Sequence, residues 1–161
     1  MKTKYLFFSI VFAAFLSSSM PLGSHSLEIG KEAPSLTLSS GNRHDNLPEL
    51  EGNYVIINFW SFDDPISRIN NSRLSDVIST IPSSKVKFIS ICMDDNKTLR
   101  DEIMSADNVS ANTISLSIND LSPQVAEDFQ TNSGNRSFII DPFGNLAGIC
   151  PSAESISGII S

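Results

Sequence analysis

The run Tyr-Val-Ile-Ile-Asn-Phe-Trp at residues 54–60 constrains the fold of this chain more than any other segment. It has the length of a strand, and it consists mostly of β-branched and aromatic residues. Such a run is typical of a strand that is buried on both faces of a sheet. Asp64 and Pro65 follow, and an aspartate cap with proline in the first turn is a common helix start. The segment therefore predicts an α/β domain with helices on both sides of a sheet.

Strand and helix signals alternate along the rest of the chain. The first helix is predicted to run from Asp64 to Pro82, because large apolar residues recur near helical spacing at Ile66, Ile69, Leu74, Val77, Ile78 and Ile81. Further strands are predicted at 86–93, 113–118, 137–141 and 146–150, and further helices follow residues 96, 122 and 152. The order β-α-β-α-β-α-β-β-α predicts a three-layer α/β/α sandwich. Its mixed central sheet would have parallel strands and a C-terminal antiparallel hairpin across the turn at 142–145.

Residues 1–26 have the features of a secretory signal peptide. Lys2 and Lys4 precede about a dozen mostly apolar residues at 5–16, and small polar residues follow. We therefore expect an exported domain at residues 27–161, periplasmic or secreted, without stable membrane insertion after cleavage. Loss of the leader removes two lysines and no acid, which leaves nine Lys and Arg against eighteen Asp and Glu, a net charge of −9. This balance argues against nucleic-acid binding, which needs a basic face.

Three ordered motifs resemble those of the thioredoxin-like superfamily, in its exported redoxin branch of TlpA- and ResA-like, AhpC/TSA-related proteins, which looks bacterial. Gly-Lys-Glu-Ala-Pro-Ser-Leu-Thr-Leu at 30–38 resembles the opening of that branch. Residues 47–60, ending in Asn-Phe-Trp, resemble its first strand, and Ser-Phe-Ile-Ile-Asp-Pro-Phe-Gly at 137–144 resembles its fourth. The resemblance covers residues 28–161 and implies a thioredoxin fold.

The positions that carry the chemistry of that family are altered here. The resemblance implies a Cys-x-x-Cys at the start of the first helix, but those positions hold Asp64, Pro65, Ile66 and Ser67. A carboxylate can cap the helix, yet it cannot form a sulfur–sulfur bond, and a serine cannot resolve one. The family's cis-proline position falls on Asn135, where a cis bond would cost several kcal/mol more than at proline. We therefore expect a trans bond there and an altered groove.

The two cysteines, Cys92 and Cys150, are predicted to lie on the second and fifth strands. Three strand spacings separate these strands in the thioredoxin arrangement, about 14 Å, which is too far for a disulfide. We expect both cysteines to be buried small apolar residues without a disulfide. Cys92, near the end of its strand, is the better candidate for a residual reactive thiol.

The leading interpretation is an exported thioredoxin-like domain without thiol–disulfide activity. It would be a binding or structural module that holds an unidentified protein partner at the groove around Asp64, Ser67 and Asn135, or at its acidic face. One alternative is a thiol oxidoreductase that uses Cys92 in a mono-cysteine mechanism. Another is a Ca²⁺ site, because the oxygen-rich side chains of Asp63, Asp64, Asp94 and Asp95 occupy neighbouring loops. No cofactor is expected, and the sequence does not specify an oligomeric state.

Overall fold

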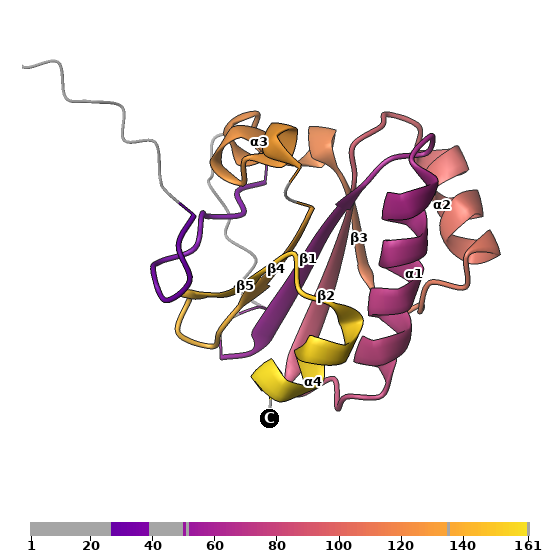
Figure 1. Ribbon diagram of the computed structural model, residues 1–161. Helices are drawn as coiled ribbons and strands as arrows, with labels where there is room; N and C mark the ends of the chain where they lie inside the picture. Colours follow the sequence, from indigo (N-terminus) through magenta and orange to yellow (C-terminus); the bar gives the residue numbers. More distant parts are fainter. Residues whose placement is uncertain (1–26, 39–49, 51, 135, 161) are drawn as a thin grey trace, which may run out of the picture.

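The computed structural model describes residues 27–38, 50, 52–134 and 136–160, and a five-stranded mixed sheet forms its centre (Figure 1). The strand order is β3-β2-β1-β4-β5. β1 pairs in parallel with β2, and β2 pairs in parallel with β3. β4 is antiparallel to both β1 and β5. The strands are β1 (Tyr54–Trp60), β2 (Val86–Cys92), β3 (Ile114–Ser117), β4 (Ser137–Ile140) and β5 (Leu146–Ile149).

The helices occur where the sequence predicts them. Asp64 caps α1, Asn96 caps α2, and α3 and α4 follow residues 122 and 152. The α-helices are α1 (Pro65–Ser79), α2 (Lys97–Ala106), α3 (Gln124–Asp128) and α4 (Ala153–Ile160), and the short 3₁₀ helices are η2 (Ile118–Asp120) and η3 (Thr131–Ser133). The three-layer sandwich with a mixed sheet is therefore confirmed. The predicted leader at 1–26 lies outside the described residues.

Alternation along the central strand β1 produces two hydrophobic cores, one on each face of the sheet. Val55, Ile57 and Phe59 face α3 and the N-terminal segment, whereas Ile56 faces α1 and α4. The first core is completed by Leu36, Ile89, Ile91, Leu121, Val125, Phe129, Phe138 and Leu146, and the second by Leu74, Ile78, Val86, Phe88, Ile139, Ile156 and Ile160. Burial on both faces explains why every residue of the run except Asn58 is apolar or aromatic.

Two outer segments, residues 27–38 and α2, are attached to the rest of the fold by specific contacts. The N-terminal segment at 27–38 pairs with the β4–β5 turn through an isolated bridge between Glu32 and Asn145. α2 lies beside α1 (Figure 1), and the Arg68 guanidinium donates to both carboxylate oxygens of Asp107 at 2.8 and 2.9 Å. This ion pair joins the first turns of α1 to the C-terminal end of α2.

The packing of α1 differs from the prediction in its first two turns. Ile66 and Ile69, expected on the buried face, are 80% and 53% exposed. Ser67, Asn71 and Ser75 are buried against the sheet instead. Further along the helix, Leu74 and Ile78 are buried, as the spacing predicts. The first half of α1 therefore presents aliphatic side chains to solvent and polar ones to the core.

Candidate functional site

The loop between β1 and α1 contains the four positions at which the family resemblance places its redox pair. Asp64 is the N-cap of α1, and its Oδ1 accepts hydrogen bonds from the backbone N–H groups of Ile66 and Ser67 at 3.1 and 3.2 Å. Pro65 occupies the first turn, where the absence of an N–H has no cost. The predicted helix start is thus confirmed at these residues. The carboxylate uses the positive end of the helix as a cap.

Ser67 is a buried side chain whose hydroxyl has partners within the same turn. It is 5% exposed, and its Oγ donates to the backbone carbonyl of Asp64 at 2.9 Å. The same Oγ accepts a hydrogen bond from the Ser61 N–H at 3.2 Å. No basic side chain contacts this hydroxyl through any of the hydrogen bonds that the described residues form, so it lacks the general base that an activated serine requires.

A carboxylate from the neighbouring loop fixes the β1–α1 loop from the other side. Asp94 Oδ2 accepts from the Ser61 hydroxyl and from the Phe62 N–H, both at 2.7 Å. The Phe62 ring packs against Trp60, with 5.9 Å between the ring centroids. One acidic side chain thereby joins the loops that follow β1 and β2.

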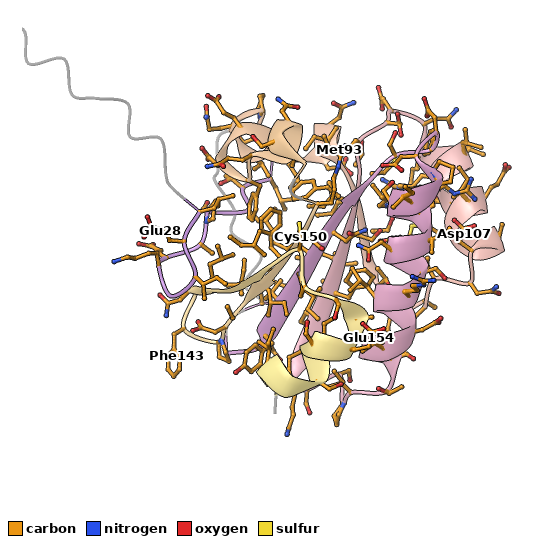
Figure 2. The ribbon with its side chains drawn as sticks, in the orientation of Figure 1. Glu28, Met93, Asp107, Phe143, Cys150 and Glu154 are labelled. Carbon is orange, nitrogen blue, oxygen red and sulfur yellow. The ribbon has the colours of Figure 1, made fainter. Side chains whose placement is uncertain are left out.

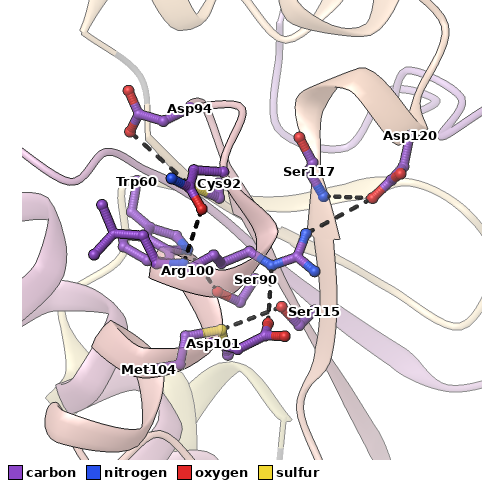
Figure 3. Close-up of polar contacts among 12 residues, drawn as sticks. Trp60, Ser90, Cys92, Asp94, Arg100, Asp101, Met104, Ser115, Ser117 and Asp120 are labelled. Atoms are coloured by element: carbon purple, nitrogen blue, oxygen red, sulfur yellow. Dashed lines mark hydrogen bonds and ion pairs between the residues drawn. The ribbon is translucent and has the colours of Figure 1, made fainter.

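Cys92 ends β2 beneath this carboxylate and is fully buried (Figure 3). Its Sγ lies 4.0 Å from Asp94 Oδ2. Burial raises the pKa of the Cys92 thiol to about 11, so the thiol is protonated near neutral pH. Because the thiolate is the nucleophilic form, the structure gives no support to a reactive Cys92.

Cys150 lies immediately after β5, and it differs from the prediction in two respects. It stands outside the strand with a positive φ of 45°, and its side chain is exposed, so the expectation of burial is wrong for this cysteine. Its backbone N–H donates to the Ser137 carbonyl at 2.7 Å, which completes the pairing with β4. Both cysteines are free, and two strands, β1 and β4, separate β2 from β5.

A chain of buried polar side chains lies beneath α1 and was not found by sequence reasoning. The Trp60 indole donates to Ser90 at 2.8 Å, and the Ser90 hydroxyl donates to Asn71 Oδ1 at 3.0 Å. Asn58 Nδ2 donates to the same Asn71 oxygen at 3.0 Å, and Asn58 Oδ1 accepts from Asn70 Nδ2 at 3.1 Å. Among the described residues no buried side-chain nitrogen or oxygen lacks a partner, so this chain of hydrogen bonds is complete. It fixes the start of α1 on the sheet.

The burial of Arg100 is a second polar feature that the sequence analysis does not predict. It projects from α2 across the edge of the sheet beside Cys92 and is 6% exposed (Figure 3). Its Nε donates to Asp101 at 3.3 Å, and its Nη1 lies 3.8 Å from Asp120 Oδ2. The guanidinium therefore ties α2 to the segment that follows β3.

The four carboxylates weighed as a calcium site do not converge. Asp64 and Asp94 are engaged in the helix cap and in the loop contact described above, whereas Asp63 and Asp95 are exposed. In the described part of the chain, no group of three or more acidic, histidine or cysteine side chains is placed to hold a metal ion. The calcium hypothesis is therefore not supported by the geometry.

Two further features complete the surroundings of the site. Asn135, the predicted cis-proline position, lies outside the described residues. A groove of about 340 Å³ adjoins the start of α1, and Pro65, Arg68, Ile69, Ser72, Arg73 and Asp107 line it.

No helix within the described ranges has the length and hydropathy needed to cross a membrane.

Comparison with known families and structures agrees with this geometry. The family model described as "AhpC/TSA family" matches residues 29–149. No curated protein sequence matches significantly. A thioredoxin-like protein from Parabacteroides distasonis aligns with a TM-score of 0.67 at 20% identity, over 84% of this chain and 96% of that one. The thioredoxin domain of a thiol-disulfide oxidoreductase from Bacteroides vulgatus gives 0.63 at 16% identity, over 84% and 100%. A secreted disulfide oxidoreductase of Mycobacterium tuberculosis gives 0.53 at 18% identity, over 79% and 93%.

Proposed function

This chain belongs to the AhpC/TSA family and has a thioredoxin-like fold, and from that premise we propose that it is an exported member that binds a protein partner and does not carry out thiol–disulfide exchange. The observation that carries the proposal is the start of α1, where Asp64 and Ser67 stand at the two redox positions and are held by hydrogen bonds of the helix cap.

The two-step thiol–disulfide exchange of a Cys-x-x-Cys pair uses sulfur at both of these positions. A thiolate attacks one sulfur of a disulfide and forms a mixed disulfide, and a second thiol then displaces it. Asp64 offers carboxylate oxygens and Ser67 a hydroxyl, so neither half of the exchange can occur there. Cys92 does not replace them, because it is fully buried and its pKa is raised to about 11.

Support for a binding role comes from what the site retains. The helix cap, the Asp94 contact and the buried polar chain hold the β1–α1 loop in a defined conformation without any redox pair. A rigid loop beside a groove favours recognition, because little conformational entropy is lost on binding. Export is supported by the leader-like residues 1–26 and by the likeness to a secreted oxidoreductase.

Reduction of insulin in the presence of dithiothreitol tests the first half of the proposal. We expect the mature chain to reduce insulin at the rate of dithiothreitol alone, and the variants Cys92→Ser and Cys150→Ser to do the same. A rate well above this background that disappears in either variant would contradict the proposal.

Site-specific crosslinking tests the second half. A photoreactive amino acid at Asp63, beside the helix start, should give a discrete adduct with a protein in the cells that produce this chain. The same group at Glu127 on α3 is the matched control and should not give that adduct. Equal adducts at both positions, or none at Asp63, would count against a partner at this loop.

A further inference from the structure

The first two turns of α1 expose aliphatic side chains that a core helix would bury. Ile66 is 80% exposed and Ile69 53% exposed, and Pro65 beside them is also exposed. Residues three apart lie on one side of a helix, so Ile66 and Ile69 form a continuous surface, which we call the apolar patch together with Pro65. Large aliphatic side chains grouped in this way are typical of interaction surfaces.

The end of the apolar patch nearest the loops is acidic. The Phe62 N–H donates to Asp94 at 2.7 Å, so the loops that follow β1 and β2 touch, and exposed carboxylates stand next to both contact residues. The acidic side chains at this end are those of Asp63, Asp64, Asp94 and Asp95, against one exposed lysine, Lys97. The local field therefore favours a cation.

The apolar patch also borders the groove of about 340 Å³. Pro65 and Ile69 contribute apolar side chains to its lining, and the paired Arg68 and Asp107 line it as well. Arg73, one turn beyond Ile69, also lines the groove. The groove offers space for an aliphatic side chain beside the acidic loops.

We propose that the apolar patch binds a polypeptide segment in which an aliphatic side chain stands next to lysine or arginine. This inference rests on the proposed function and names the chemical class of its partner. The aliphatic side chain packs on Ile66 and Ile69, and the cation lies against Asp63 and Asp95. The predicted mature chain, with a net charge of −9, attracts such a segment at long range and repels anionic surfaces and second copies of itself.

Synthetic peptides test the proposal without knowledge of the natural partner. The probe is a fluorescein-labelled heptapeptide that alternates lysine and leucine, and its binding is followed by fluorescence anisotropy. Two comparison peptides replace every lysine by glutamate or every leucine by serine. We expect both comparison peptides to bind roughly tenfold more weakly, because each lacks one of the two contacts.

Variants of the chain locate the binding surface. The pair Ile66→Ser with Ile69→Ser, and the pair Asp63→Asn with Asp95→Asn, should each weaken binding of the lysine–leucine peptide about tenfold. The matched controls are Phe143→Ser, an exposed apolar side chain far from Met93 and the loops (Figure 2), and the pair Glu102→Gln with Glu127→Gln. These controls should change binding less than twofold. All the altered side chains are exposed, and unchanged melting temperatures would verify folding.

Three results would overturn the proposal. They are no binding of the lysine–leucine peptide at millimolar concentration, equal binding of the glutamate peptide, and equal losses in the patch variants and the controls. If one of these three results is obtained but an adduct still forms at Asp63 in cells, only the proposed chemistry of the partner is rejected, and the proposed function stands. If no adduct forms either, both proposals fail.

Discussion

Removal of the Asp94 carboxylate tests whether the β1–α1 loop is held by the neighbouring loop. One oxygen, Oδ2, accepts both the Ser61 hydroxyl and the Phe62 N–H at 2.7 Å. Hydrogen bonds to a charged group contribute about 1.5–3 kcal/mol each, and partial exposure places these two toward the lower end. Asp94→Ala should therefore lower the free energy of unfolding by about 2–4 kcal/mol.

Two companion variants separate charge from contact. In Asp94→Asn one amide oxygen can still accept both bonds without the charge, so the loss should be about half that of the alanine variant. Ser61→Ala removes one donor and should cost about 1 kcal/mol. Because both changes remove the same bond, the Asp94→Ala, Ser61→Ala double variant should be less destabilised than the sum of the two, by about 1 kcal/mol.

Urea denaturation measures these free energies, and hydrogen exchange of the Phe62 amide reports on the loop directly. Asp95→Ala is the matched control, since its side chain is exposed and the change should stay within about 0.5 kcal/mol. The reasoning is refuted if Asp94→Ala costs no more than this control, or if the Phe62 amide exchanges equally fast in the two variants.

Three further predictions concern the two cysteines and the buried Asn71. A thiol reagent should modify Cys150 alone in the native chain and Cys92 only after unfolding, as mass spectrometry of the labelled protein would record. The pKa of Cys92 is raised to about 11 in the folded chain. The contribution of this thiol to the free energy of unfolding should therefore be fully present below pH about 9. It should then fall by up to about 1.4 kcal/mol per pH unit as pH rises toward 11, and Cys92→Ala in parallel urea titrations should lack this slope. Asn71→Ala leaves two buried donors without their acceptor and should cost about 2–5 kcal/mol by urea denaturation, whereas the exposed Asn112→Ala should cost less than about 0.5 kcal/mol.

The sequence predicts the secondary structure closely because its signals are local and agree with each other. The run at 54–60 is confirmed as β1 with the same bounds, and Asp64 and Asn96 cap helices as their positions suggest. Strand ends were placed within a residue or so of their observed positions, with Cys150 outside β5. Each of these features depends on a few neighbouring residues, so a single sequence contains the information.

The interior of α1 was predicted less well, because the buried side of a helix depends on what it packs against. Helical spacing of isoleucines suggested a uniform apolar face, yet β1 and β2 place Asn58 and Ser90 beneath the first turns. These polar groups need partners inside the protein, and Asn71 supplies one oxygen to both. The consequence is a rotation of the apolar side chains of the first turns toward solvent. A sequence signal did exist, since Asn58 interrupts an otherwise apolar strand.

The candidate site could be predicted in position but not in its contacts. The helix start at residues 64–67 follows from Asp and Pro alone, whereas the role of Asp94 requires two loops to meet whose contact residues lie 33 and 32 positions apart. Asp94 was grouped with Asp63, Asp64 and Asp95 as a cation site, but its carboxylate binds a hydroxyl and an N–H of the chain instead.

The hydrogen bonds of Asp64 and Ser67 explain how the β1–α1 loop keeps its conformation without cysteines. In an exchanging thioredoxin-like protein, the start of the first helix must stabilise a thiolate. Here the carboxylate of Asp64 occupies that helix end, and Ser67 is enclosed in the same turn. The N–H groups of Ile66 and Ser67, which could stabilise a thiolate at the helix start, are bound by the Asp64 carboxylate, so these hydrogen bonds serve to hold the loop. The proposed binding role therefore uses a loop that these hydrogen bonds hold in place, next to the exposed Ile66 at the start of α1.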